Sequence, residues 1–508
     1  MHQIQQDIYL QKETLRLMAL HNFFTVDLGA TSGRTILASF DGAKMELVEL
    51  TRFENPILPL GGHLFWNLPH LYNEILKGLK KVVSQGISID SIGIDTWGCD
   101  FAFFSGEGQL LGLPYCYRDP HTDGAQEKFF AKMPSGELYR RTGIQFMNFN
   151  SVFQLDTLLR NGCSALKAAG KVLFIPDALS YMLTAEAVCE YTVATTSQIL
   201  NAQTGDLDPE ILKALGLERS RFGRIVRPGE QIGVLTEQVQ KAVGLGPVPV
   251  IAVAGHDTGS AVAAVPAESA DFAYLSCGTW SLLGVEAPAP IISDDSFREN
   301  FTNEGGVEGT IRFLKNICGM WIFEQCRKDF RDAPENVGEL VALAGTTDFA
   351  SLIDPDAECF AHPASMTSAI DDYCRATAQA VPSSPAEYCR LIFRSLAFRC
   401  RQVVGLLGEL TPVRIAALNV IGGGSRNAFL MQCLADALGL KVICGPVEGT
   451  AMGNALVQAK AAGLCDDLSS MRRISKASVE LTEYFPKRNM DSEYARFLEI
   501  QKKYNNTL

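Results

Sequence analysis

The feature that most constrains this fold is a strand–turn–strand pattern that occurs once in each half of the 508-residue chain. In the first half, β-type runs at 23–26 and 35–38 flank the turn 27–34, which reads DLGATSGR. In the second half, two further β-type runs flank the turn 276–281, which reads SCGTWS. Both turns combine glycine with small hydroxyl residues. Two such hairpins in one chain predict two related domains that face one another across a cleft.

Strands alternate with helices through the first half, which predicts the α/β class. Apolar residues at helical spacing predict a helix over 68–83, and short apolar runs predict strands over 92–97 and 101–104. The second half closes with a predicted strand over 418–421, the glycine turn 422–427 and a helix over 429–438.

No low-complexity linker separates the two predicted domains, and we place their boundary within 262–272. The predicted segments are an N-terminal extension (1–22), a first domain (23–265), a second domain (266–485) and a C-terminal tail (486–508). The stretch 330–390 is weakly patterned and predicts no element clearly.

Each hairpin turn is suited to a phosphate group. Glycine lets backbone N–H groups approach a phosphate closely, and the Thr and Ser hydroxyls add further donors. Asp27, at the end of its strand, is placed to hold Mg²⁺ through water. The same residue types also form ordinary hairpin turns, so either turn alone is weak evidence. Together the two turns could hold opposite sides of a nucleotide's phosphates.

A buried strand over 250–254 leads into Gly255, His256 and Asp257. In open α/β sheets, residues that contact ligands lie at the carboxyl ends of strands, and this position makes Asp257 a candidate catalytic residue. The alternative is that Asp257 only caps the helix that follows.

Three further stretches carry candidate ligand contacts. The turn 422–427 lacks both the Lys of a P-loop and the third glycine of the dinucleotide fingerprint, and it is either a nucleotide loop or a tight turn. The stretch 94–101 places Asp95 and Asp100 near Trp97, which suits a sugar or a packed Trp with surface acids. The polar residues 302–306 predict a loop that could contact a ligand or only turn the chain.

Composition excludes several classes of partner. A net charge of −12 gives no electrostatic help in binding nucleic acid or an anionic membrane, so neither is predicted. The 14 cysteines are scattered and read as small buried apolar residues in a reducing cytosol. The charged N-terminus is not a signal peptide, and no apolar run is long enough for a membrane span. These observations predict a soluble, cytoplasmic protein whose partners are small molecules.

Four motifs, taken in order, resemble those of the FGGY carbohydrate kinases. They are Asp-x-Gly-x-x-x-Gly-Arg (27–34), Gly-His-Asp-Thr (255–258), Ser-x-Gly-Thr-Trp-Ser (276–281) and Gly-Gly-Gly-Ser-x-Asn (422–427). The resemblance spans 23–485, and the more specific stretches, 95–98 and 303–306, resemble members that act on L-rhamnulose. It implies an α/β fold of two ribonuclease H-like domains, of the actin/hexokinase/Hsp70 type, around a central cleft. The first domain would hold the sugar and the second would hold ATP.

The resemblance also implies the reaction and the residues that perform it. The γ-phosphate of ATP, with Mg²⁺, would pass to the C1 hydroxyl of L-rhamnulose, giving L-rhamnulose 1-phosphate and ADP in L-rhamnose catabolism. Asp257 would be the general base, and the sugar would contact Gly98, His256, Asp257, Thr258 and Asn303. ATP would contact Ala30, Thr31, Ser32, Gly33, Arg34, Thr279, Gly423, Gly424 and Asn427, and Asp27 would hold Mg²⁺.

The sequence departs from the family pattern at a few positions. Cys277 stands where the family commonly has Ser, Cys99 replaces a typical Val, and the first 20 residues have no counterpart. The nearest alternative is an FGGY kinase for another ketose or polyol, such as L-fuculose, L-xylulose or glycerol. A sugar-sensing regulator would need a DNA-binding segment, and a chaperone ATPase would need a peptide-binding domain. The sequence predicts neither.

Overall fold

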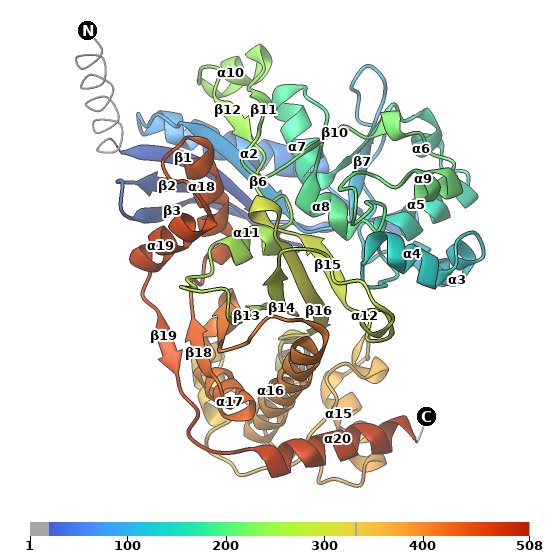
Figure 1. Cartoon of the computed structure of the whole chain (residues 1–508), viewed down its shortest axis with the longest axis vertical. Coiled ribbons are helices and arrows are strands. Elements are labelled where there is room, and N and C mark those ends of the chain that lie inside the picture. Colours follow the sequence, from blue (N-terminus) through green and yellow to red (C-terminus); the bar gives the residue numbers. More distant parts are fainter. Residues whose placement is uncertain (1–19, 331–332, 507–508) are drawn as a thin grey trace. The chain divides into compact units, whose positions relative to one another are not determined.

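The computed structural model describes residues 20–330 and 333–506, which form two compact units (Figure 1). Unit 1 contains the residues up to 268 together with 287–313 and 449–479, and unit 2 contains 269–286, 314–448 and the residues from 480 onward. Both units are therefore discontinuous in sequence. The single boundary predicted near residue 265 does not describe this division. The predicted extension lies mostly outside the described residues, and its last two residues begin β1.

Unit 1 is built on a six-stranded sheet with the order β11-β12-β6-β1-β2-β3. Strands β1, β6 and β12 are parallel, β2 pairs antiparallel with β1, and β3 pairs antiparallel with β2. The register places Asp27 of β1 beside Arg34 on one side and beside Asp95 of β6 on the other. Residues in register on neighbouring strands project to the same face, so these three side chains come together.

The elements of unit 1 include the predicted strands and the predicted helix of the first half. Its strands are β1 (His21–Leu28), β2 (Ser32–Phe40), β3 (Met45–Glu54), β4 (Ile57–Leu60), β5 (His63–Trp66), β6 (Ser91–Thr96), β7 (Phe101–Phe104), β8 (Lys171–Phe174), β9 (Val188–Glu190), β10 (Arg224–Val226), β11 (Gln231–Val234), β12 (Pro249–Ile251) and β15 (Thr302–Gly305). Its α-helices are α2 (Leu68–Ser84), α3 (Ala125–Phe130), α4 (Ser135–Thr142), α5 (Ser151–Arg160), α6 (Ser164–Ala168), α7 (Ile175–Thr184), α8 (Tyr191–Thr196), α9 (Pro209–Leu215), α10 (Glu237–Val243), α11 (Asp257–Ala263), α12 (Asp294–Arg298), α18 (Gly449–Ala461) and α19 (Leu468–Ser478).

Helix α2 shows why the helical pattern of the first half was readable. The Asn67 side chain caps its first turn by accepting the backbone N–H of His70, and a proline follows within that turn. The apolar positions at helical spacing, Leu71, Ile75 and Leu79, are all buried in the core of unit 1. Helix α18 comes from the far end of the sequence (red in Figure 1) and nevertheless packs against β1 and β6.

Unit 2 contains a second sheet, in which the strands follow the order β16-β14-β13-β17-β18-β19. Strand β16 begins in unit 1, and its residues from 314 onward belong to unit 2. The strands are β13 (Phe272–Cys277), β14 (Trp280–Ala287), β16 (Ile311–Cys318), β17 (Ala417–Ile421), β18 (Lys441–Cys444) and β19 (Thr482–Tyr484). The α-helices are α13 (Trp321–Asp329), α14 (Val337–Leu343), α15 (Met366–Ala376), α16 (Pro385–Leu410), α17 (Ala428–Leu438) and α20 (Asp491–Asn505).

The second hairpin is confirmed as the antiparallel pair β13–β14, and the predicted helix 429–438 is confirmed as α17. The predicted tail 486–508 contains helix α20. In the stretch 330–390, which lacked a clear pattern, the described residues form α14, α15 and the start of α16. These assignments confirm the α/β class.

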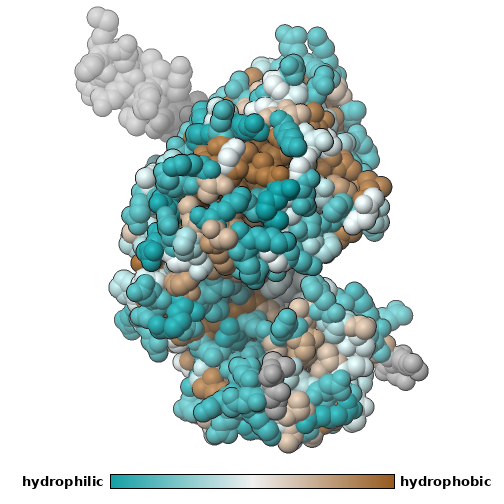
Figure 2. Space-filling model, turned by 90° about the vertical axis from the view of Figure 1, so that its right-hand side faces the viewer, coloured by the Kyte–Doolittle hydropathy of each residue, from teal (hydrophilic) through white to brown (hydrophobic). Residues whose placement is uncertain are grey.

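Hydrophilic side chains predominate around smaller brown patches on the face drawn in Figure 2. Among the described helices, none combines the length and the apolar character that crossing a bilayer requires. All 14 cysteines are free thiols.

Candidate active site

The first hairpin places Asp27 at the end of β1, opposite Arg34 of β2. The Arg34 guanidinium donates a 2.5 Å hydrogen bond to Asp27 Oδ2. Asn55 holds the turn, since its backbone N–H donates to Thr31 O and its side-chain amide donates to Gly29 O, both at 3.0 Å. The predicted ATP contacts Ala30 to Arg34 therefore form a turn that is fastened beside the Asp27 carboxylate.

Asp95 is the buried neighbour of Asp27, and the sequence placed it only in a stretch that could contact a sugar or carry surface acids. Its side chain is 0% exposed, and Asn454 of α18 donates to its Oδ2 at 2.5 Å. Its Oδ1 has no hydrogen-bond partner among the described residues. Burial and the Asp27 carboxylate raise the pKa of Asp95 well above its ordinary value. A buried carboxylate oxygen without a protein partner, beside a second carboxylate, is a position that a cation or a water molecule would satisfy.

Asp257 is the first residue of α11, immediately after the loop that follows β12. Its Oδ1 accepts the Thr258 backbone N–H at 2.5 Å and the Thr258 hydroxyl at 3.1 Å, and it lies 3.5 Å from His256 Nε2. Its Oδ2 takes no hydrogen bond from the described residues, and the side chain is 32% exposed. His256 occupies the N-cap position and Asp257 is the first residue of the helix, where its carboxylate accepts a backbone N–H of the first turn. One carboxylate oxygen is held, and the other is open.

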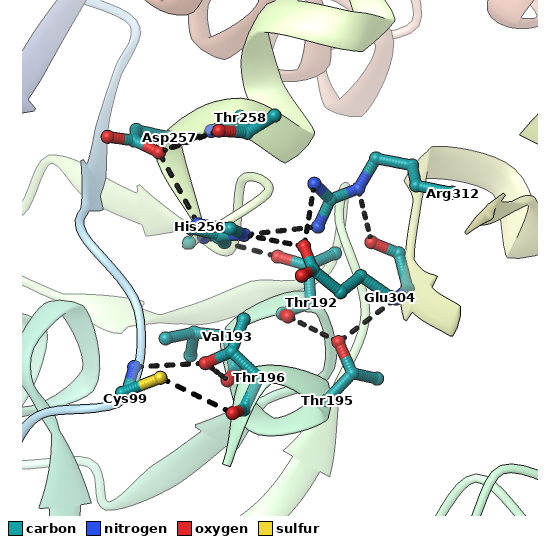
Figure 3. Close-up of polar contacts among 12 residues, drawn as sticks. Cys99, Thr192, Val193, Thr195, Thr196, His256, Asp257, Thr258, Glu304 and Arg312 are labelled. Atoms are coloured by element: carbon teal, nitrogen blue, oxygen red, sulfur yellow. Dashed lines mark hydrogen bonds and ion pairs between the residues drawn. The ribbon is translucent and has the colours of Figure 1, made fainter. Parts of the chain in front are cut away.

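Behind His256 lies a buried pair of opposite charges, shown in Figure 3. Arg312 Nη1 lies 3.1 Å from Glu304 Oε2, and His256 Nδ1 lies 3.2 Å from both the same oxygen and Arg312 Nη2. Burial alone would raise the pKa of Glu304, but Arg312 and His256 outweigh it and hold the pKa below its ordinary value. The imidazole is therefore fixed from one side by the ion pair, and its Nε2 faces Asp257.

The residues 302–306 correct one prediction. They were expected to form a polar loop, but 302–305 are the buried strand β15. The Asn303 and Glu304 side chains tolerate burial because each has partners from elsewhere in unit 1, whereas the buried Thr302 hydroxyl has no hydrogen-bond partner among the described residues. Asn303 Nδ2 donates to Gly143 O and to Ile291 O, both at 3.0 Å, and its Oδ1 accepts the Ile291 backbone N–H at 2.6 Å. The Asn303 amide thus holds three backbone groups, and its side chain is closed to solvent in this structure.

The loop after β6 carries Gly98 and is fastened by Asp100. The Asp100 carboxylate accepts four hydrogen bonds, from the indoles of Trp66 (2.6 Å) and Trp97 (2.9 Å), the Gln154 amide (2.8 Å) and the Tyr117 backbone N–H (3.1 Å). Burial raises the pKa of Asp100 to about 6, against these bonds. Trp97 is packed, as the structural alternative predicted, but Asp95 and Asp100 are both buried and are not surface acids.

Unit 2 brings together the two turns predicted to contact the nucleotide. A Cβ added at Gly424 would lie 2.3 Å from Cys277 Sγ, and one at Gly422 would lie 3.2 Å from Cys277 O. The glycine turn therefore lies directly on the β13–β14 hairpin. Thr279 is exposed at the tip of the β13–β14 hairpin. The Asn427 side chain caps α17 by accepting the Leu430 backbone N–H at 2.9 Å, and its buried Nδ2 has no partner among the described residues.

The sequence analysis missed Arg312 and Asn454, which hold the buried acids Glu304 and Asp95 of unit 1. Arg312 lies in the apolar run of β16, and a charged residue inside such a run was the only local signal of a buried ion pair. Asn454 gave no signal, because its partner Asp95 is distant in sequence. The predicted site residues divide between the units: Asp27, Ala30 to Arg34, Gly98, His256, Asp257, Thr258 and Asn303 lie in unit 1, and Thr279, Gly423, Gly424 and Asn427 lie in unit 2.

Comparison with known families decides what kind of protein this is. Residues 23–264 match the model of the N-terminal domain of the FGGY family of carbohydrate kinases, and residues 273–462 match the model of its C-terminal domain. The chain belongs to the FGGY family of carbohydrate kinases. The resemblance carried by the four motifs is thereby confirmed.

Curated relatives and solved structures agree with this family. The chain is 57% identical over 466 residues to a rhamnulokinase from Bacteroides thetaiotaomicron, covering 92% of this chain and 96% of the relative. It is 43% identical to a rhamnulokinase from Pectobacterium atrosepticum, covering 93% and 95%. Gluconate kinase from Lactobacillus acidophilus (TM-score 0.78, 18% identity, covering 96% and 97%) shares the fold. So does Plasmodium falciparum glycerol kinase with ADP (TM-score 0.78, 15% identity, covering 96% and 98%).

Proposed function

We propose that this FGGY kinase transfers the γ-phosphate of ATP to the C1 hydroxyl of L-rhamnulose, giving L-rhamnulose 1-phosphate and ADP. The observation that carries the proposal is the 57% identity, over nearly the whole length of both chains, to a protein named rhamnulokinase. The stretches 95–98 and 303–306, which pointed to the same sugar, both lie in unit 1 with Asp257.

We propose Asp257 as the general base. Its Oδ1 is held by Thr258 and faces His256, whereas Oδ2 is open. The open oxygen would accept the proton of the sugar hydroxyl as the new O–P bond forms, and a positioned base of this kind typically contributes 10²–10⁴-fold in rate. His256, whose Nε2 faces Asp257, and Gly98, which follows the Thr96 that pairs with His256, would orient the sugar.

Asp27 is proposed to hold Mg²⁺ through water, and Asp95 supports this proposal. Among the described residues, no three His, Cys, Asp or Glu side chains converge to bind a metal directly. Mg²⁺ usually keeps several of its waters and needs few protein ligands. The unpartnered Asp95 Oδ1 beside the Asp27 carboxylate fits such a hydrated cation. Bound there with ATP, Mg²⁺ would neutralise charge that develops on the phosphates.

The nucleotide is proposed to contact the turn 30–34 in unit 1 and the turns 276–281 and 422–427 in unit 2. Each of the three turns contains glycine and offers backbone N–H groups, which suit phosphate oxygens in a chain with a net charge of −12. The use of ATP and the free thiols also support a cytoplasmic location.

A panel of sugars tests the substrate. ADP release would be followed by a coupled assay with L-rhamnulose, L-fuculose, L-xylulose and glycerol, with Mg²⁺ and without it. We expect the highest kcat/KM for L-rhamnulose, and phosphorus NMR should place the phosphate on C1. A higher kcat/KM for another acceptor, or a phosphate on another carbon, would contradict the proposed substrate while leaving the family unchanged.

A further inference from the structure

Helix α8 (Tyr191–Thr196) is short, fully buried and contains three threonines in the sequence TVATT. It follows β9, and the Glu190 carboxylate caps it by accepting the backbone N–H groups of Thr192 and Val193 at 2.9 and 3.0 Å. The same carboxylate accepts the Gly255 backbone N–H at 3.0 Å. No motif in the sequence drew attention to this helix.

The hydroxyl proton of each threonine is directed into the helix itself. Thr192 donates to Glu190 Oε2 at 2.6 Å, Thr195 donates to Thr192 O at 2.6 Å, and Thr196 donates to Val193 O at 2.7 Å. A hydroxyl has one proton and two lone pairs. Because the proton is already used, each of these oxygens can act toward its surroundings only as an acceptor.

Each of the three threonine hydroxyl oxygens accepts a backbone N–H from a different segment. Figure 3 shows the three threonine side chains. Thr192 accepts from His256 at 3.3 Å, Thr195 accepts from Gly305 at 2.9 Å, and Thr196 accepts from Cys99 at 3.0 Å. These three segments carry the residues that the sequence predicts to contact the sugar: His256 to Thr258, Gly98 and Asn303, of which the Asn303 amide is bonded to backbone groups in this structure.

Glycines provide an independent sign that these segments are packed against α8. A Cβ added at Gly98 would lie 2.8 Å from Thr196 Oγ1, and one at Gly255 would lie 2.8 Å from Glu190 Oε2. A Cβ at Gly305 would lie 2.4 Å from the Tyr191 ring. Each segment therefore has a glycine where it meets the helix. These three glycines belong to the motifs at 95–98, 255–258 and 303–306. None of them has a positive φ, so the backbone conformation does not account for the glycine at these positions.

We propose that Thr192, Thr195 and Thr196 are positioning residues that set the three sugar-contacting segments relative to one another. The proposal rests on the proposed function, because it takes those segments to bind the sugar. A polyhydroxylated ligand needs several hydrogen-bonding groups in place at once, and displacement of one group by about 1 Å can lower the rate by about a hundredfold. None of these hydroxyls has to touch the sugar to determine how well it binds.

The chain offers a matched control in Thr184 of α7. This buried threonine donates to Ser180 O at 2.8 Å and accepts the Glu186 backbone N–H at 3.1 Å, but it serves no proposed sugar contact. Thr195→Val and Thr196→Val remove an acceptor and leave a buried N–H unpaired, and Thr184→Val likewise removes the acceptor of the N–H of Glu186, which is itself an exposed residue. Thr195→Ser and Thr196→Ser keep the hydroxyl.

Steady-state kinetics would be measured with the ketose that the wild type prefers in the panel, so a wrong substrate assignment would be seen separately. We expect Thr195→Val and Thr196→Val to lower kcat/KM for the ketose about tenfold or more, with an unchanged KM for ATP. Thr184→Val should keep both constants, and the serine variants should recover most of the loss. Wild-type kcat/KM in both valine variants of α8 would overturn the proposal, as would an equal loss in Thr184→Val. If one valine variant fails to fold, Thr192→Val provides the second measurement.

Discussion

The sharpest test of the packing concerns Gly453, at the contact between α18 and α11. A Cβ added at this glycine would lie 1.7 Å from Ser260 O and 2.5 Å from Ser260 C. An unstrained contact needs roughly 3.5 Å. Since the obstacle is backbone and no side chain can rotate away, Gly453→Ala requires the two helices to separate by between about 1 and 2 Å.

The energetic cost follows from this separation. Overpacking a well-filled core commonly costs about 1–3 kcal/mol and sometimes more, and a clash with backbone belongs at the upper end. Alanine regains about 1 kcal/mol through its better helix propensity. We therefore expect a net loss of about 2 kcal/mol or more in the free energy of unfolding. Activity should fall as well, because α11 begins with Asp257 and its displacement would move the proposed base.

Urea denaturation and steady-state kinetics would be compared with Gly405→Ala in α16. Gly405 is exposed, and a Cβ there would meet nothing within 4 Å. That control should gain about 0.5–1 kcal/mol from helix propensity and keep its kcat. If Gly453→Ala is as stable as the wild type and equally active, the close approach of the two helices is not the constraint described above.

Three further predictions concern acidic residues of unit 1. Asp257→Asn should lower kcat about 10²–10⁴-fold while ADP binding by calorimetry is retained, and a wild-type kcat would remove Asp257 as the base. Glu304→Gln leaves Arg312 buried without a counter-charge and should lower the free energy of unfolding in urea by about 3–5 kcal/mol. Adding Arg312→Met should restore part of this loss. If the losses of the two single variants simply add in the double variant, the two residues are not paired. The folded pKa of Asp100, raised to about 6, makes the folded state hold this proton longer than the unfolded state does. Its contribution to the free energy of unfolding is therefore greatest at about pH 4 and is lost by about pH 7. The decline between these two pH values amounts to about 3 kcal/mol. Urea unfolding of Asp100→Asn should lack this decline, and identical pH profiles for wild type and variant would show that Asp100 is not its source.

Local patterns were sufficient to predict much of the fold. The two hairpins, helix α2 and the strand before His256 could be read because glycine turns, β-type runs and helical spacing are properties of adjacent residues. The Asp257 carboxylate could be singled out for the same reason, since a strand end can be recognised from a few residues.

What the sequence did not predict depends on partners that are distant in the chain. Residues 302–305 read as a loop because they are polar, and their burial depends on distant partners such as the carbonyls of Gly143 and Ile291 and the side chain of Arg312. The role of Asp95 depends on Asn454 in the same way. The sequence of α8 looks like that of any short polar helix. The role proposed for its threonines becomes visible only when the segments that they bind are known.

The discontinuity of unit 1 has a consequence for biosynthesis. The residues up to 268 leave the ribosome without α18, and the Asn454 and Gln458 side chains that reach β1 and β6 are made roughly 200 residues later, about 10–40 s at usual elongation rates. During that interval the Asp95 side of the sheet lacks its cover. We therefore expect nascent chains that stop before residue 449 to expose this sheet face and to depend on chaperones, even though they contain the whole first hairpin and Asp257.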